Sequence, residues 1–129
     1  MQKWGITLVR VVTGLVFVMH GGQKLFYIGL QQTSAAFAKM GIPLPGVAGP
    51  LVAVVELIGG LCLILGVFTR VAAILLALDM LGAIVFVHGR NGFFLPRGFE
   101  YALVLLAVNL MLAQGGAGPT WRVWRIGRK

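Results

Sequence analysis

The sequence predicts an all-α membrane protein, a four-helix transmembrane bundle with a short interfacial helix between the first two spans. The 129-residue chain is 59% hydrophobic and only 11% charged, whereas soluble domains carry about 25% charged residues. Its mean hydropathy is +0.96. Its only acids, Glu56, Asp79 and Glu100, lie inside or at the mouth of apolar runs. These observations indicate one integral membrane domain over residues 1–129.

Four apolar runs are each long enough to cross a bilayer, which takes about 20 helical residues. Helices are expected because the bilayer core leaves no water for open backbone groups, and the runs lack the alternation of barrel strands. We expect spans at about residues 4–27, 47–68, 70–88 and 98–117.

The connections between these runs predict how the spans are arranged. Thr33 or Ser34 can cap a short helix over residues 35–40 that stops at Gly41. We expect this helix to lie on the membrane surface. A tight turn over residues 66–70 would make the second and third spans an antiparallel hairpin.

The formal net charge of +8 first suggests nucleic acid as a partner. The basic residues lie between apolar runs and in the tail, so we interpret them as topology signals and lipid headgroup contacts, and we exclude nucleic acid. Seven of them share a side with both termini, which favours cytoplasmic termini. The other side holds Lys24, Lys39, Arg90 and Arg97.

Helical spacing gathers the polar residues of each span on one face. On the first span this face comprises Arg10, Thr13, Gly14, Phe17, His20, Gly21 and Lys24. On the second it comprises Gly49, Ala53, Glu56, Gly59, Gly60 and Leu63. On the third it comprises Ala72, Leu75, Leu76, Asp79, Gly82, Ala83 and Phe86. Small residues allow close helix approach, so we expect these faces to point into the bundle.

Glu56 and Asp79 are expected near the membrane midplane, roughly 13 Å from the span ends. A carboxylate at that depth needs a partner. We predict a buried charge network in which Arg10 pairs with one of the two acids. Burial then favours the protonated form of the other acid, which could relay protons. The alternative is that both acids are structural pins that fix helix register.

A second cluster is expected near the outer membrane surface. It comprises His20, Lys24, His88, Arg90 and Glu100. Two histidines at one depth could ligate haem, which we disfavour, or exchange protons beside a quinone. They could also be ordinary interfacial histidines. Two histidines and Glu100 are too little to predict a metal site.

Several motifs together resemble the DoxX family of small bacterial membrane proteins. They are LVR (8–10), GLVF (14–17), HGGQKLF (20–26), FAKMGIP (37–43), VELIGG (55–60), LGVFTR (65–70), His88, GFF (92–94) and EYA (100–102). The resemblance covers nearly the whole chain. It implies a four-helix bundle in the bacterial inner membrane with a link to quinone or redox chemistry. The polar positions that it carries over are Arg10, His20, Lys24, Glu56, Arg70, His88 and Glu100, whereas Asp79 is not among them.

The sequence therefore predicts a DoxX-like subunit linked to quinone chemistry or oxidative stress, acting with redox-protein partners, in which the outer cluster binds the ligand. Whether this chain is itself an oxidoreductase is left open, and a second copy could complete its polar face. The first rival is a small proton-coupled transporter. The second is a structural assembly factor without a ligand.

Overall fold

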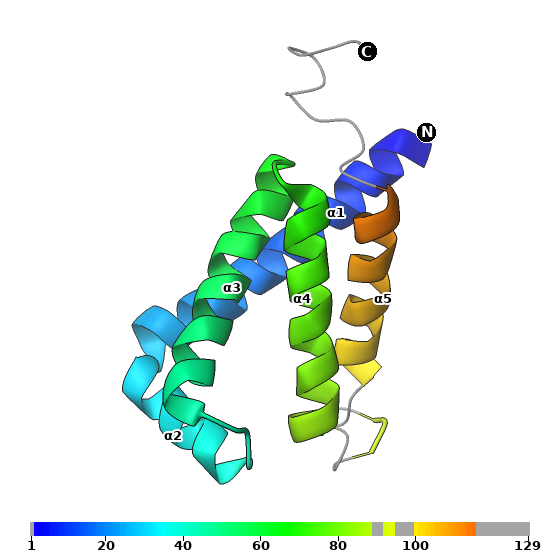
Figure 1. Cartoon of the computed structure of the whole chain (residues 1–129). Helices are drawn as coiled ribbons and strands as arrows, with labels where there is room; N and C mark the ends of the chain where they lie inside the picture. Colours follow the sequence, from blue (N-terminus) through cyan, green and yellow to red (C-terminus); the bar gives the residue numbers. More distant parts are fainter. Residues whose placement is uncertain (1, 89–91, 95–99, 116–129) are drawn as a thin grey trace.

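The computed structural model describes residues 2–88, 92–94 and 100–115, and every regular element in that part of the chain is a helix (Figure 1). The α-helices are α1 (Gln2–Gly22), α2 (Leu30–Lys39), α3 (Pro45–Leu65), α4 (Thr69–Ala83) and α5 (Glu100–Gly115). Two short π-helical segments, η1 (Gln23–Tyr27) and η2 (Ile84–His88), continue α1 and α4.

Among the described residues, three helical segments are long and apolar enough to cross a membrane. They are Trp4–Tyr27, Pro45–Leu65 and Thr69–Phe86. These segments coincide, within about three residues at each end, with the first three spans expected from the sequence. The region of the fourth contains α5, a shorter apolar helix of 16 residues.

The α3–α4 connection is the expected tight turn. Gly66 ends α3 with φ +72°, and Phe68 precedes α4 with φ +49°. Glycine adopts the left-handed region freely, whereas a bulky residue does so rarely. Two left-handed residues in three reverse the chain at once, so α3 and α4 lie side by side (Figure 1).

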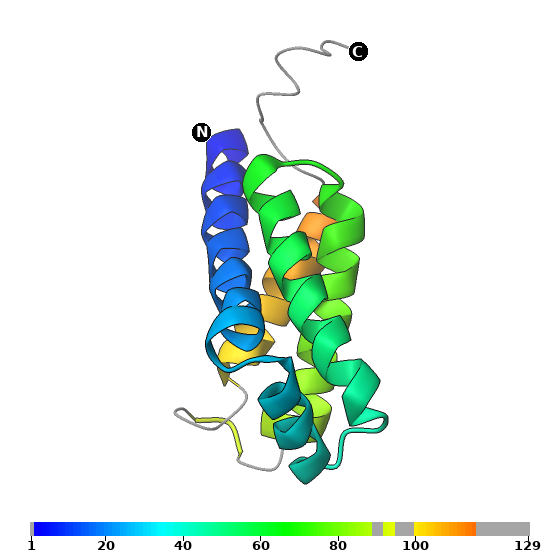
Figure 2. The ribbon, with the colours of Figure 1, turned by 90° about the vertical axis from the view of Figure 1, so that its left-hand side faces the viewer.

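Helices α1 and α3 pack backbone to backbone through glycines, and Figure 2 shows them side by side. A methyl group on Gly60 would lie 2.6 Å from the Gly14 carbonyl oxygen. A methyl group on Gly21 would collide with the backbone nitrogen of Leu57. The two contacts fix an antiparallel register in which Gly14 lies opposite Gly60 and Gly21 opposite Leu57.

The buried core joins all the long helices. Its largest fully buried side chains are Phe17 from α1, Leu63 from α3, Leu76 from α4, and Leu112 and Asn109 from α5. Large apolar side chains also cover the outside, including Trp4, Leu8, Leu51 and Leu78. An apolar exterior around a small-residue interior is typical of helices that face lipid.

The predicted inward face is confirmed for α3 and wrong in part for α4. In α3 the buried residues are the six expected ones. In α4 the buried residues are Thr69, Ala72, Ala73, Leu76, Ala77 and Met80, while Leu75 is exposed and Asp79 is half-buried. The face is rotated because α4 packs against both α3 and α5, so its buried surface is centred between them.

Helix α2 differs from the expected short helix. It begins at Leu30 after Gly29, whose φ is +89°, so neither Thr33 nor Ser34 caps it. Thr33 is buried, and its hydroxyl donates to the Lys24 carbonyl at 3.3 Å. The close approach of Ser34 to Gly49 seats α2 against α3 (Figure 2).

Candidate functional site

The bundle has two unlike halves. We call the end with the N-terminus and the α3–α4 turn the proximal half, and the end with α2, η1, η2 and the start of α5 the distal half (Figure 1). The distal half contains a cavity of about 530 Å³. Small-molecule sites usually have about 300 to 1,000 Å³, so this cavity is the size of a ligand site.

The walls of the cavity are mostly apolar. They are formed by Phe17, Phe37, Met40, Ile42, Val52, Leu78, Met80, Gly82, Ala83, Phe86, Tyr101, Ala102 and Leu105. Every long helix contributes, α2 contributes Phe37, and Met40 follows directly after α2. The polar residues of the wall, besides the Tyr101 hydroxyl, are His20, Lys24, Glu56 and Asp79. Apolar walls with a few convergent polar groups are typical of small-molecule sites.

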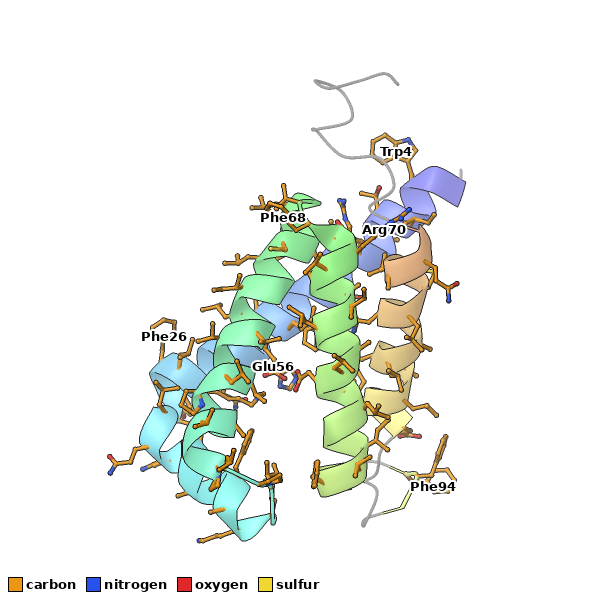
Figure 3. The ribbon with its side chains drawn as sticks, viewed as in Figure 1. Trp4, Phe26, Glu56, Phe68, Arg70 and Phe94 are labelled. Carbon is orange, nitrogen blue, oxygen red and sulfur yellow. The ribbon has the colours of Figure 1, made fainter. Side chains whose placement is uncertain are left out.

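A buried ion pair lies at the polar end of this cavity. Lys24 Nζ donates to Glu56 Oε1 at 2.6 Å, and their side chains are 19% and 5% exposed. Glu56 points from α3 toward α4 (Figure 3). The Lys24 stem reaches inward from η1, because the Gly21 contact with α3 brings this end of the first span against the Glu56 turn.

Asp79 extends the ion pair across to α4. Its carboxyl group lies beside the Glu56 carboxyl group in the wall of the cavity. No N–H or hydroxyl group among the described residues donates to the buried Asp79 Oδ2. Two carboxylates at such close range repel one another, so a site that holds both favours one proton between them. Lys24, Glu56 and Asp79, which we call the polar triad, therefore carry no net charge together.

The partner of Glu56 is Lys24 and not the expected Arg10. The glycine register sets Arg10 opposite the Ile64 end of α3, about two helical turns from Glu56. Arg10 is buried in the proximal half, at 3% exposure. The sequence missed Lys24 as the partner because a residue near the span end had been assigned to the surface cluster.

The structure combines parts of the two predicted clusters and leaves others apart. His20 and Lys24 line the same cavity as Glu56 and Asp79. His20 is nonetheless more exposed than the triad. Glu100 is half-buried at the start of α5, where its backbone N–H donates to the Phe93 carbonyl, and it is not a lining residue. The His88 side chain and Arg90 lie outside the described residues.

Sequence reasoning also missed the aromatic wall. Phe17 was expected on the inward face of the first span, but nothing in the sequence showed that it meets Phe37, Phe86 and Tyr101 around one space. The π-helical segments were not predicted either. Both lie at the distal half, and such segments frequently occur at functional sites.

The described residues contain no group of three or more His, Cys, Asp and Glu side chains placed to hold a metal ion. What they do place together is one neutral polar triad in an apolar cavity. Such a site suits a neutral, largely apolar molecule with a polar end.

Fold and site together define a helical membrane protein with a ligand-sized cavity between its spans. The chain belongs to the DoxX family, whose model matches residues 5–89. This match supports the resemblance seen in the motifs.

Named relatives agree with a membrane location. A Bacillus subtilis protein named "Putative oxidoreductase CatD" is 36% identical over 84% of this chain and 78% of its own length. An uncharacterised membrane protein of Mycobacterium tuberculosis is 39% identical over 73% of this chain and 60% of its own. The Escherichia coli inner membrane protein YphA is 30% identical over 64% and 58%. No solved structure matches this chain at a comparable level of significance.

Proposed function

We propose that this DoxX protein binds a lipid-soluble quinone in the distal cavity and presents it to a redox partner protein in the membrane. The observation that carries the proposal is the cavity of about 530 Å³ with the polar triad at one end. A quinone has a planar ring that suits aromatic walls and oxygen atoms that accept hydrogen bonds. Lys24 has ammonium hydrogens beyond the one donated to Glu56, so it can donate to such an oxygen.

The redox part of the proposal draws on the oxidoreductase name of the Bacillus subtilis relative. In this account the chain binds and orients the quinone, and a partner supplies or removes electrons. The triad holds one proton next to the ring, where quinone chemistry needs protons. A second copy of this chain is a further partner that the account allows.

We also propose that α5 is the fourth span and that both termini are cytoplasmic. Helix α5 packs against α4 along its length, and the apolar sequence from 98 to 117 exceeds its 16 described residues. Alkaline phosphatase fusions after residues 42, 68, 92 and 129 test this topology. The account expects activity only at 42 and 92, and activity at 129 would contradict it.

The binding proposal is tested with detergent-purified protein and a short-chain benzoquinone, by isothermal titration calorimetry. We expect saturable binding to the native protein and at least tenfold weaker binding to Lys24→Met. The matched control is Lys39→Met, because Lys39 is an exposed lysine of α2 that does not line the cavity. Absence of saturable binding to the native protein, or equal loss in both variants, would refute the proposal.

Proton-coupled transport is the second candidate function, and the observation that favours it is the pair of acids, Glu56 and Asp79, that line one cavity inside the spans. Proteoliposomes that take up or expel a quinone analogue only under a proton gradient, and lose this with Glu56→Gln, would replace the subunit model with a transporter.

A further inference from the structure

Asp79 is the one member of the polar triad that the family resemblance does not carry over. It lines the cavity beside Lys24 and Glu56. The other two members contact one another directly, because Lys24 donates to Glu56. Asp79 also contacts Glu56, yet its Oδ2 atom is buried and receives no donor from the described residues.

A buried oxygen without a donor is costly. Leaving such a group unsatisfied is unfavourable because it has lost its water without gaining a partner, and most buried polar atoms in proteins do have partners. The missing donor has room to arrive from the cavity, because Asp79 is one of its lining residues. Gly82 and Ala83 follow Asp79 on α4 and also line the cavity. Because both are small, they leave space beside the Asp79 carboxyl group.

The charge of the triad limits what the donor can be. Lys24 contributes one positive charge, and the two carboxyl groups that share a proton contribute one negative charge. A cationic ligand would bring an unbalanced charge into an apolar cavity, which is expensive. A neutral hydroxyl group supplies a donor without adding charge.

We propose that Asp79 makes the cavity selective for the reduced, hydroxyl-bearing form of its ligand, a benzoquinol, over the corresponding benzoquinone. A quinol hydroxyl donates to the Asp79 carboxyl and still accepts a hydrogen bond from Lys24. A quinone carbonyl accepts from Lys24 as well, but it places a second acceptor against Asp79. This inference rests on the proposed function, since it names the form of the ligand at the same site.

The test compares the affinity of one short-chain benzoquinol with that of its benzoquinone, under anaerobic conditions, by calorimetry on the detergent-purified protein. We expect the native protein to bind the quinol about tenfold more tightly. In Asp79→Leu the preference is expected to fall to within about twofold, while the quinone still binds. Asp79→Asn adds an amide donor and is expected to favour the quinone.

The matched control is Asn109→Leu, which also removes a buried polar side chain from a spanning helix. Asn109 does not line the cavity, and its amide donates to the Leu105 carbonyl at 2.8 Å. This control should keep the native quinol preference. Both substitutions of Asp79 remove a buried acid, so at least one folded variant is expected, checked by gel filtration.

The outcomes separate the two proposals. If the native protein binds both forms equally, or if Asp79→Leu keeps the quinol preference, the role of Asp79 is refuted and the quinone cavity stands. If the native protein binds neither form, both the role of Asp79 and the proposed function are refuted.

Discussion

The proximal and distal halves are built from the same long helices, but the proximal half is tightly packed and the distal half encloses a cavity. In the proximal half α1 and α3 touch through glycine backbones, and Leu63 and Leu112 have no exposed surface. In the distal half the same helices surround about 530 Å³. In the distal half α1 and α3 also touch, at Gly21 and Leu57, but the bundle keeps room there for a ligand and a buried ion pair.

The largest loss of stability is expected from a larger side chain at the contact between Gly14 and Gly60 in the proximal half. Gly60→Val places a side chain 2.6 Å from the Gly14 carbonyl, where backbone must move. Overpacking typically costs about 1–3 kcal/mol and occasionally more, and we expect the upper end or loss of folding. The measurement is thermal stability in detergent, followed by gel filtration.

The control for that substitution is Gly82→Val, because nothing lies within 4 Å of a methyl group at Gly82. It removes a glycine from a spanning helix without a backbone collision. Equal stability of the two variants would show that the α1–α3 contact is not as close as described.

Adding the same volume to each half gives the second comparison. Ala73 is fully buried in the core, so Ala73→Leu should destabilise the protein by about 2 kcal/mol. Ala83 lines the cavity, so Ala83→Leu should change stability by less than about 1 kcal/mol and abolish quinone binding. Chemical denaturation followed by circular dichroism measures both. The account fails if Ala83→Leu is the more damaging change.

Removing the cation of the distal ion pair should destabilise the protein by a similar amount. Breaking a fully buried pair costs about 3–5 kcal/mol. Because the Lys24 side chain retains 19% exposure, we expect about 2 kcal/mol for Lys24→Met. Adding Glu56→Gln should recover part of this loss, as coupled residues are non-additive. Additive losses in the double variant would contradict a direct pair.

The smallest effect concerns the contact between α2 and η1. Thr33→Val removes the hydroxyl that donates to the Lys24 carbonyl. A hydrogen bond of this kind contributes about 0.5–1.5 kcal/mol net, so we expect about 1 kcal/mol in the same denaturation assay. The control is Thr7→Val, which removes the hydroxyl of a threonine on α1, away from this contact. Ser34→Ala is not a suitable control, because Ser34 lies against Gly49.

The accuracy of the structure predicted from the sequence differs from helix to helix. The inward face of α3 was predicted residue for residue, since small residues recur there at helical spacing. The face of α4 was displaced, because spacing on one helix does not reveal that two neighbours share it. The start of α2 depends on Gly29, which has a positive φ of +89°. The possible cap residues Thr33 and Ser34 pointed instead to a later start.

The site was predicted as a list of residues but not as an arrangement. Depth estimates separated Lys24 from Glu56, although a lysine stem of four methylenes spans that difference readily. The register that joins them is set by Gly21 against Leu57, a contact between distant parts of the chain. The cavity itself is space left by several helices, and no single stretch of sequence encodes it.

The most direct test of the central claim is the quinone content of gently purified protein. Organic extracts of the native protein and of Ala83→Leu would be compared by mass spectrometry at equal amounts of protein and phospholipid. The account predicts that a quinone or quinol accompanies the native protein in near-stoichiometric amount and is lost from Ala83→Leu. Equal amounts in the two extracts, or none in either, would contradict it.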